Sequence, residues 1–175
     1  MATADEQEIL SGYVGWGGLA DAFDETKSAW VKEYAELKDL TSEEEYLSAR
    51  ESTLNAHYTS PVIIRGIYRT LQRMGFTKGN LLEPSMGIGN FFGMLPETIR
   101  ESHLYGVELD DLTGRIARQL YPKADITVDG YEKTTFPNDF FDVAVGNVPF
   151  GQYKVADKKY DKYNFLIHDY FFGKT

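Results

Sequence analysis

The chain has 175 residues, of which 42% are hydrophobic and 14% aromatic, and this predicts one domain with enough apolar side chains for a real core. Its formal net charge of −9 argues against a free-standing nucleic-acid-binding surface, because phosphate contacts need lysine and arginine. The charge does not exclude a catalytic module whose nucleic-acid contacts lie in other regions.

The sequence gives little support for a metal site or a membrane-spanning segment. The chain has no cysteine, so it can form neither a disulfide nor a thiolate metal site. Its three histidines, His57, His103 and His168, are scattered, and we therefore expect no metal. There is no run of 18 apolar residues and the N-terminus is acidic, which predicts a soluble intracellular protein without membrane contact.

Residues 1–56 are predicted to form an extension of helices and loops. Their glycine- and aromatic-rich stretch GYVGWGGLADAF offers Tyr13 and Trp16 to pin a loop to the body of the protein. Two helices are expected between residues 25 and 54. Either Thr41 or Ser42 would cap the second of them.

Residues 57–175 alternate between helical and strand patterns. The stretch VIIRGIYRTLQRMGF reads as an amphipathic helix with apolar positions that include Val62 and Ile63. Four short apolar runs, NLLEP, HLYGVELD, ADITVDG and FFDVAVGN, then read as strands with helices between them. Such alternation predicts βαβ units and a parallel sheet. A last helix would pack through the cluster Tyr170-Phe171-Phe172.

The ends of three predicted strands carry residues suited to binding a ligand. Glu83 ends the first strand and precedes Gly87 and Gly89, which would form a tight turn into a helix. Glycines alone occur in many ordinary loops of this kind. An acid beside them would repel a pyrophosphate, so the combination favours a cationic or zwitterionic ligand.

The second and third strand ends add an acid and an amide. Glu108 follows the glycines by about twenty residues, where an acid commonly binds ribose hydroxyls, although a merely solvated acid would look the same. In GNVPFG, Asn147 offers an acceptor and donors, Val148 a main-chain carbonyl, Pro149 a stiff turn and Phe150 a flat ring. This set could hold a planar amine, or it could be an ordinary turn beside a core phenylalanine.

Taken together, these segments resemble the S-adenosylmethionine-dependent methyltransferases that act on amino groups. EPSMGIGNF, GVELD and GNVPF look like their first, second and catalytic motifs, and HYTSP (57–61) looks like the segment that closes over the methionine end of the cofactor. The order of segments is that of the gamma-type N6-adenine DNA methyltransferases. YVGWGGL, LNAHYTSP and NFLIHDYFF further resemble the methylase region of the large helicase-methylase proteins of bacterial conjugative elements and phages.

The resemblance implies an α/β, Rossmann-like methyltransferase fold, the cofactor S-adenosylmethionine, and a bacterial cytoplasmic location. It implies methyl transfer to the N6 amine of an adenine flipped out of DNA, with these catalytic residues: Asn147, Val148, Pro149 and Phe150. The residues that it implies for the cofactor are Tyr58, Thr59, Glu83, Ser85, Gly87, Gly89, Phe91, Glu108, Leu109, and either Asp129 or Glu132 for the cofactor's adenine.

Two departures from the family pattern matter. Val148 stands where the family usually has proline, but the contact expected there is a backbone carbonyl that valine also supplies. The family has a seven-stranded sheet, whereas about four strands are predicted here, so we expect a truncated sheet and DNA contacts mostly in regions beyond this chain. The fourth strand would be an edge, open to self-association unless the last helix covers it.

Two further functions stay open at this point. Similar motifs serve methylation of protein glutamine and of guanine in RNA, because these acceptors are planar amines too. The chain could also be a cofactor-binding or scaffolding module without turnover. The usual inference for genes of such mobile elements is modification of DNA against restriction, which the sequence itself does not test.

Overall fold

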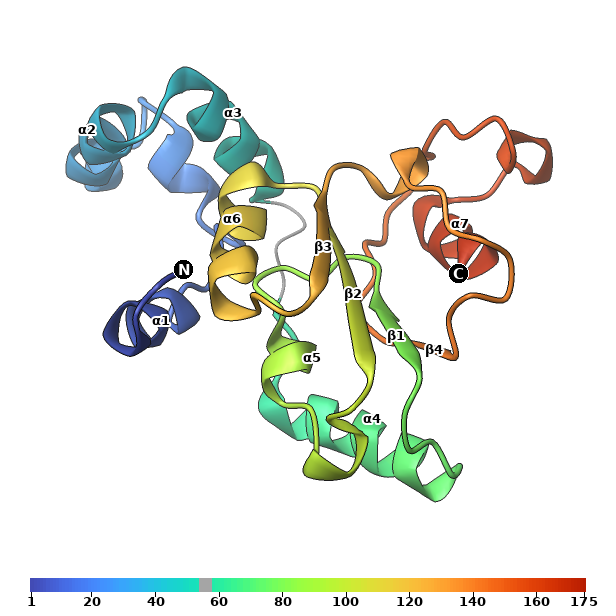
Figure 1. Cartoon of the computed structure of the whole chain (residues 1–175). Helices are drawn as coiled ribbons and strands as arrows, with labels where there is room; N and C mark the ends of the chain where they lie inside the picture. Colours follow the sequence, from blue (N-terminus) through green and yellow to red (C-terminus); the bar gives the residue numbers. More distant parts are fainter. Residues whose placement is uncertain (54–57) are drawn as a thin grey trace.

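The computed structural model describes residues 1–53 and 58–175 and has an α/β fold built on one parallel sheet (Figure 1). The strands are β1 (Asn80–Glu83), β2 (His103–Glu108), β3 (Asp125–Val128) and β4 (Val143–Ala144). They pair in the order β3-β2-β1-β4, and all three pairings are parallel. This is the order of the first four strands of a doubly wound Rossmann sheet. The predicted α/β fold class and the parallel sheet of about four strands are confirmed.

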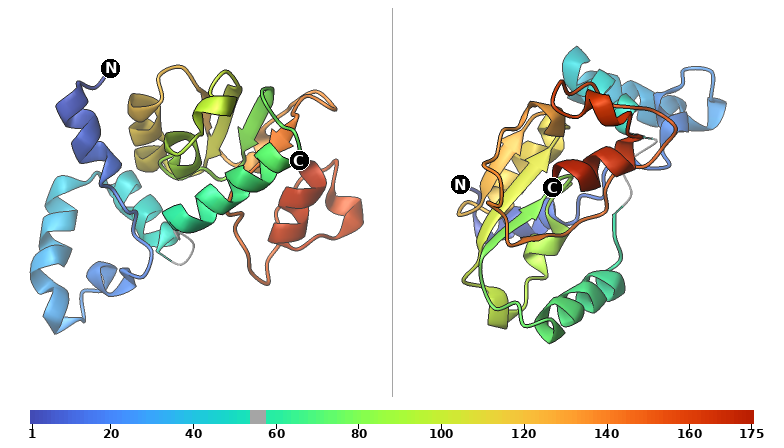
Figure 2. Two further views of the ribbon diagram at one scale, coloured as in Figure 1. Left: turned by 90° about the horizontal axis from the view of Figure 1, so that it is seen from below. Right: turned by 90° about the vertical axis from the view of Figure 1, so that its right-hand side faces the viewer.

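The sheet is covered on both faces because successive residues of a strand point to opposite sides. Leu81 and Leu82 of β1 are both fully buried, one in each of two core clusters. The first cluster includes side chains from α4, α5 and α6, and the second includes side chains from α7. Figure 2 shows how these helices surround the strands. Helices therefore lie on both faces, and α7 packs on a face of the sheet rather than along its β4 edge.

The helices of this part match the expected positions, with local differences. Pro61 opens the first of them at a position where its missing N–H is not needed. Asp110 caps another by accepting a 2.8 Å hydrogen bond from the main-chain N–H of Thr113. The elements are α4 (Pro61–Arg73), α5 (Asn90–Gly93), η3 (Glu97–Ile99), α6 (Asp111–Leu120), η4 (Tyr131–Lys133), η5 (Asp161–Tyr163) and α7 (Ile167–Lys174).

The N-terminal extension has a small core of its own. Its buried members are Ala22, Phe23, Tyr46 and Ala49, and Trp16 packs against them. The extension contains α1 (Ala4–Ser11), η1 (Ala20–Phe23), η2 (Ser28–Trp30), α2 (Val31–Leu40) and α3 (Glu43–Ser52). Both α1 and α3 lie beside α6, which fixes the extension to the sheet domain (Figure 1).

Capping explains where two of these helices begin. Helix α1 was not expected from its sequence; Thr3 and Glu6 form a reciprocal capping box at its start. Of the two candidates for the cap of α3, the structure has Ser42, again in a capping box, with Glu45. Helix α1 is also held from outside, because the Gln7 side chain donates a 2.9 Å hydrogen bond to the main chain of α6.

Several local expectations were wrong. Val62 and Ile63 are 72% and 55% exposed, because they point away from the helix face that carries Ile64. Phe172 is 73% exposed because it points away from the face of α7 that carries the buried Tyr170. The helix expected after the glycines is broken into α5 and η3, since Pro96 cannot continue a helix.

The extension's predicted boundary at residues 56 and 57, and His57 itself, lie outside the described residues. Within the described ranges, no helix is both long and apolar enough to cross a membrane. The same ranges contain no group of three or more histidine, aspartate or glutamate side chains placed to hold a metal ion.

Candidate active site

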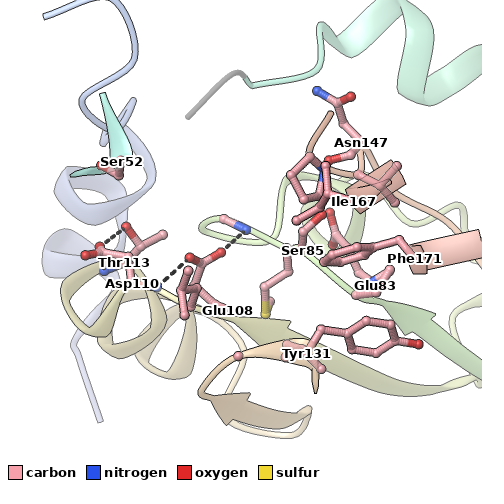
Figure 3. Close-up of a pocket in the computed structure, with 18 of the residues that line it drawn as sticks. Ser52, Glu83, Ser85, Glu108, Asp110, Thr113, Tyr131, Asn147, Ile167 and Phe171 are labelled. Atoms are coloured by element: carbon pink, nitrogen blue, oxygen red, sulfur yellow. Dashed lines mark hydrogen bonds between the residues drawn. The ribbon is translucent and has the colours of Figure 1, made fainter. Parts of the chain in front are cut away.

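A cavity of about 690 Å³ lies at the carboxyl ends of the strands (Figure 3). Its size is within the roughly 300–1,000 Å³ typical of small-molecule sites. It brings together residues that the sequence singled out separately: Tyr58, Thr59, Glu83, Ser85, Gly87, Phe91, Glu108, Leu109, Asp129, Glu132, Asn147, Val148, Pro149 and Phe150. Among the predicted site residues only Gly89 is not on the described wall, and the roles of all of them stay predictions.

The two glycines of the first loop differ in their surroundings. Both have positive φ, 56° at Gly87 and 85° at Gly89, which favours glycine. A Cβ on Gly87 would come within 3.0 Å of the Tyr58 ring, at the cavity wall. A Cβ on Gly89 would meet the Tyr121 ring at 2.6 Å, on the side of the sheet that α6 covers. Gly89 therefore permits close packing behind the loop.

Glu108 connects the glycine loop to the start of α6. One carboxylate oxygen accepts a 2.8 Å hydrogen bond from the main-chain N–H of Gly87, and the other accepts a 2.8 Å bond from that of Asp110 (Figure 3). Burial raises the pKa of Glu108, and these two backbone bonds oppose the increase. The carboxylate thus holds the loop in shape while it remains on the cavity wall.

Glu83 is the least solvated acid of the site. It is 2% exposed, and its Oε2 atom has no hydrogen-bond partner among the described residues. Burial raises its pKa well above the ordinary value of 4.5, and the negative charge of Glu108 adds to the increase. A buried carboxyl oxygen without a hydrogen-bond partner is costly, so a ligand that donates a hydrogen bond or carries positive charge would be favoured there.

In the described part of the cavity lining, the charged residues are all acidic. The described lining contains no lysine, arginine or histidine, and its carboxylates are Glu51, Glu83, Glu108, Asp110, Asp129 and Glu132. Such a lining disfavours a ligand made of phosphates and favours one with a positive charge.

The loop after β4 is fixed to the loop after β1. The Ser85 hydroxyl donates a 3.0 Å hydrogen bond to the main-chain carbonyl of Asn147. The side chain of Val148 packs against the core cluster on the α7 face, which gives position 148 a use for an apolar side chain. Phe150 is 63% exposed although it lines the cavity, so one part of its ring surface is open to solvent.

Asp129 and Glu132 are the two residues predicted for the cofactor's adenine. Asp129 accepts a 2.6 Å hydrogen bond from Lys133, and this ion pair lowers the pKa of Asp129. Both Asp129 and Glu132 line the cavity, so both stay candidates for the contact with the cofactor's adenine.

Tyr58, whose ring lies against Gly87, is partly buried, and this burial raises the pKa of its hydroxyl.

Sequence reasoning missed two walls of the cavity. Helix α3 contributes Ser48, Glu51 and Ser52, and the C-terminal part contributes Tyr153, Val155, Ile167 and Phe171. Ile167 and Phe171 lie within NFLIHDYFF, which carried part of the family resemblance, whereas none of the segments quoted for that resemblance includes α3. The resemblance was therefore the available signal for the C-terminal wall, but it did not indicate which residues of that segment would line the cavity.

The chain is similar to parts of two curated proteins. It is 30% identical over 151 residues to "Defense against restriction protein B" of Escherichia phage P1, over 85% of this chain and 5% of that protein. It is 30% identical over 105 residues to "Type II methyltransferase M.CvrRI" of Paramecium bursaria Chlorella virus XZ-6E, over 59% of this chain and 27% of that protein. The chain therefore spans only a small part of either relative's length. No protein-family model matches it.

Solved structures of several methyltransferases are partly similar. The plantazolicin methyltransferase BpumL, in complex with a substrate analogue and SAH, matches 86% of this chain and 51% of its own at 13% identity and a TM-score of 0.45. A TehB-like SAM-dependent methyltransferase from Corynebacterium glutamicum matches 47% of this chain and 44% of its own at 23% identity and a TM-score of 0.39.

Proposed function

We propose that the cavity binds S-adenosylmethionine and that this chain is the cofactor-binding and catalytic part of a methyltransferase that acts on the N6 amine of adenine in DNA. The observation that carries the proposal is the acid-lined cavity into which Glu83, Glu108 and the Asn147 motif converge from three strand ends. The similarity to a type II methyltransferase and to a protein named for defence against restriction supports a DNA substrate.

The residues present fit this cofactor. S-adenosylmethionine carries a sulfonium and an ammonium group, and the cavity wall supplies carboxylates without a basic side chain in its described part. Glu83, whose Oε2 atom is buried without a partner, would accept a hydrogen bond from the ammonium group. Glu108 keeps further lone pairs after its two backbone bonds and would accept from the ribose hydroxyls.

The chemistry of the site then divides between cofactor and chain. The cofactor would supply a methyl group already activated by its sulfonium sulfur. The chain would position the amine: the side-chain oxygen of Asn147 and the carbonyl oxygen of Val148 would accept hydrogen bonds from its two N–H groups. These bonds would favour a pyramidal nitrogen and disperse positive charge as the N–C bond forms and the methyl–sulfur bond breaks. The nitrogen then releases one proton to solvent. Phe150 would offer its ring face to the extrahelical base.

Two measurements test the proposal. Calorimetric titration with S-adenosylmethionine and S-adenosylhomocysteine should show binding, and transfer of labelled methyl should occur to unmodified DNA. Transfer to a glutamine peptide or to RNA in place of DNA would contradict the DNA-adenine substrate. Cofactor binding without any transfer would favour a binding module, and absence of cofactor binding would contradict the proposed site itself.

The larger setting is also part of the proposal. The short fraction of each relative that the chain matches accords with a methylase region within a longer polypeptide. We propose that this polypeptide is a helicase-methylase of a bacterial mobile element.

A further inference from the structure

The segment that follows the Asn147 motif is an ordered surface loop. It begins at Phe150, beyond the end of β4, and returns at the start of α7, where the main-chain N–H of Ile167 donates a 2.9 Å hydrogen bond to the carbonyl of Tyr153. Nearby, the Lys154 ammonium donates to the side chain of Asn164. Because its two ends are tied together, the loop is a compact Ω-type loop that can present side chains in fixed directions.

The two acids of this loop accept hydrogen bonds from the chain itself. Asp157 is 12% exposed; its Oδ2 atom accepts hydrogen bonds from the Tyr170 hydroxyl at 2.8 Å and from the Lys174 ammonium at 3.0 Å. Asp161 accepts a 2.8 Å hydrogen bond from the main-chain N–H of Asp157. The negative charge of Asp157 is therefore compensated by Lys174, whereas the exposed Asp161 is bonded to a main-chain N–H.

The lysines of the loop are exposed at the surface. The ammonium groups of Lys159 and Lys162 also lie over neighbouring tyrosine rings, 5.3 Å from the ring centroid of Tyr160 and 4.8 Å from that of Tyr163. Lys154, Lys158, Lys159 and Lys162 are all exposed, and within the described part of the chain none of them forms an ion pair. The loop thus carries four lysines against two aspartates in a chain whose net charge is −9. An exposed basic surface lies beside a cavity whose charged lining is acidic.

Exposed aromatic rings accompany these lysines. Tyr163 is 55% exposed and stacks on Phe165 with ring centroids 5.2 Å apart. Tyr153 and Phe150, 44% and 63% exposed, lie on the cavity wall. Ammonium groups that track phosphates, interleaved with rings on which bases stack, are the combination by which proteins hold single-stranded nucleic acid.

From this arrangement we propose that the loop of residues 150–164 binds the nucleic-acid strand next to the target nucleotide. Lys158, Lys159 and Lys162 contact its phosphates, and Tyr163 stacks on a base. This inference rests on the proposed function in taking a nucleic acid as the substrate. It moves part of the DNA contact, expected to lie mostly beyond this chain, onto the chain itself.

A second basic surface provides a matched control. Helix α4 carries Arg65, Arg69 and Arg73, all exposed and four residues apart. This helix packs on the face of the sheet opposite to α7 and the loop. Neutralising these arginines changes the net charge as much as neutralising three loop lysines, so a general charge effect would be equal in both variants.

The test is the salt dependence of binding to a short fluorescent deoxyoligonucleotide, single-stranded, measured by anisotropy with the 175-residue chain. The variant K158Q/K159Q/K162Q should bind about tenfold more weakly, and its plot of log affinity against log salt should be less steep by about 2, since three contacts to a single strand are lost. Tyr163→Leu should weaken binding by about fivefold or more with an unchanged slope.

Several results would overturn the proposal. The first is that the wild-type chain does not bind the oligonucleotide at low salt. The second is that R65Q/R69Q/R73Q weakens binding as much as the loop variant does. The third is that an acidic polypeptide such as polyglutamate displaces the bound oligonucleotide whereas unlabelled nucleic acid does not. An RNA oligonucleotide of the same sequence that bound much more tightly than DNA would retain the loop's role and contradict only the DNA substrate.

Titration with S-adenosylhomocysteine separates this inference from the proposed function. The loop variant should bind that compound like the wild type, because none of the three lysines lines the cavity. Failure of the wild type to bind it, with oligonucleotide binding intact, would contradict the proposed cofactor site and leave the loop surface standing.

Discussion

The Ser85 hydroxyl and the Asn147 carbonyl are joined by a 3.0 Å hydrogen bond. The two residues follow neighbouring parallel strands, β1 and β4, so this bond links the loop that begins at Glu83 to the motif that would hold the amine. Because the Asn147 carbonyl is engaged in this way, the orientation of the peptide that leads into Val148 depends on Ser85. We therefore expect Ser85, which the family resemblance implies for the cofactor, to act mainly by positioning the Asn147 motif.

Replacement of Ser85 by alanine should slow methyl transfer without loss of cofactor. One hydrogen bond contributes about 1 kcal/mol, which corresponds to roughly a fivefold decrease in the rate of single-turnover transfer. The dissociation constant of S-adenosylhomocysteine should change less than the rate does. Ser102→Ala is the control, since the Ser102 hydroxyl is buried without a partner among the described residues. A Ser85 variant that lost cofactor binding and transfer in parallel would contradict the positioning role.

Replacement of Asn147 by alanine should abolish most of the transfer. The side chain is expected to act on charge that develops in the reaction, and removal of such a group typically decreases the rate about 100- to 1,000-fold. Cofactor affinity, measured by titration, should remain near the wild-type value. Parallel loss of binding and transfer would instead indicate that Asn147 is only a structural residue.

The ends of the strands could be predicted from the sequence because their signals are local. Glycines with positive φ, such as Gly87, and short apolar runs that end in an acid, such as Glu83, depend on a few neighbouring residues. Once the strands are parallel, their carboxyl ends necessarily meet at one edge. The shared cavity at this edge follows from those two facts.

The remaining parts depend on contacts between distant segments. The cavity wall from α3 exists because this helix packs beside α6, with Glu45 paired at 2.8 Å to Arg115. The exposure of Phe172 and the burial of Phe171 depend on how α7 rotates against the sheet. Neither arrangement leaves a periodic pattern in the sequence, so neither could be predicted from it.

Replacement of Glu83 by glutamine should stabilise the cofactor-free chain and weaken cofactor binding. Burial raises the folded-state pKa of Glu83 above its ordinary value of 4.5. Its contribution to stability is therefore complete below about pH 4.5 and is lost as the pH rises through the raised pKa, at about 1.4 kcal/mol for each unit of increase in pKa. Glutamine stays neutral and avoids this loss.

The free energy of unfolding of Glu83→Gln, measured by urea titration across this pH range, should exceed that of the wild type increasingly as the pH rises. Its affinity for S-adenosylmethionine should fall about tenfold or more, because a hydrogen bond to a charged group is lost. Glu101→Gln, at an exposed position, should alter neither quantity. Equal stability of Glu83→Gln and the wild type at all pH values would mean that the carboxyl is not destabilising in the folded chain.

Replacement of Lys174 by methionine should destabilise the C-terminal wall of the cavity. Lys174 and Asp157 are 8% and 12% exposed, their ion pair is 3.0 Å long, and Lys174 also donates to the main-chain carbonyl of Glu132 at 3.2 Å. Removal of one partner leaves a buried, unpaired carboxylate, which costs about 3 kcal/mol. For a chain of this size the melting temperature should fall by roughly 6–12 °C in calorimetry. Lys133→Met, which breaks the exposed pair with Asp129, should have little effect, and similar melting temperatures for the two variants would contradict the importance of the buried pair.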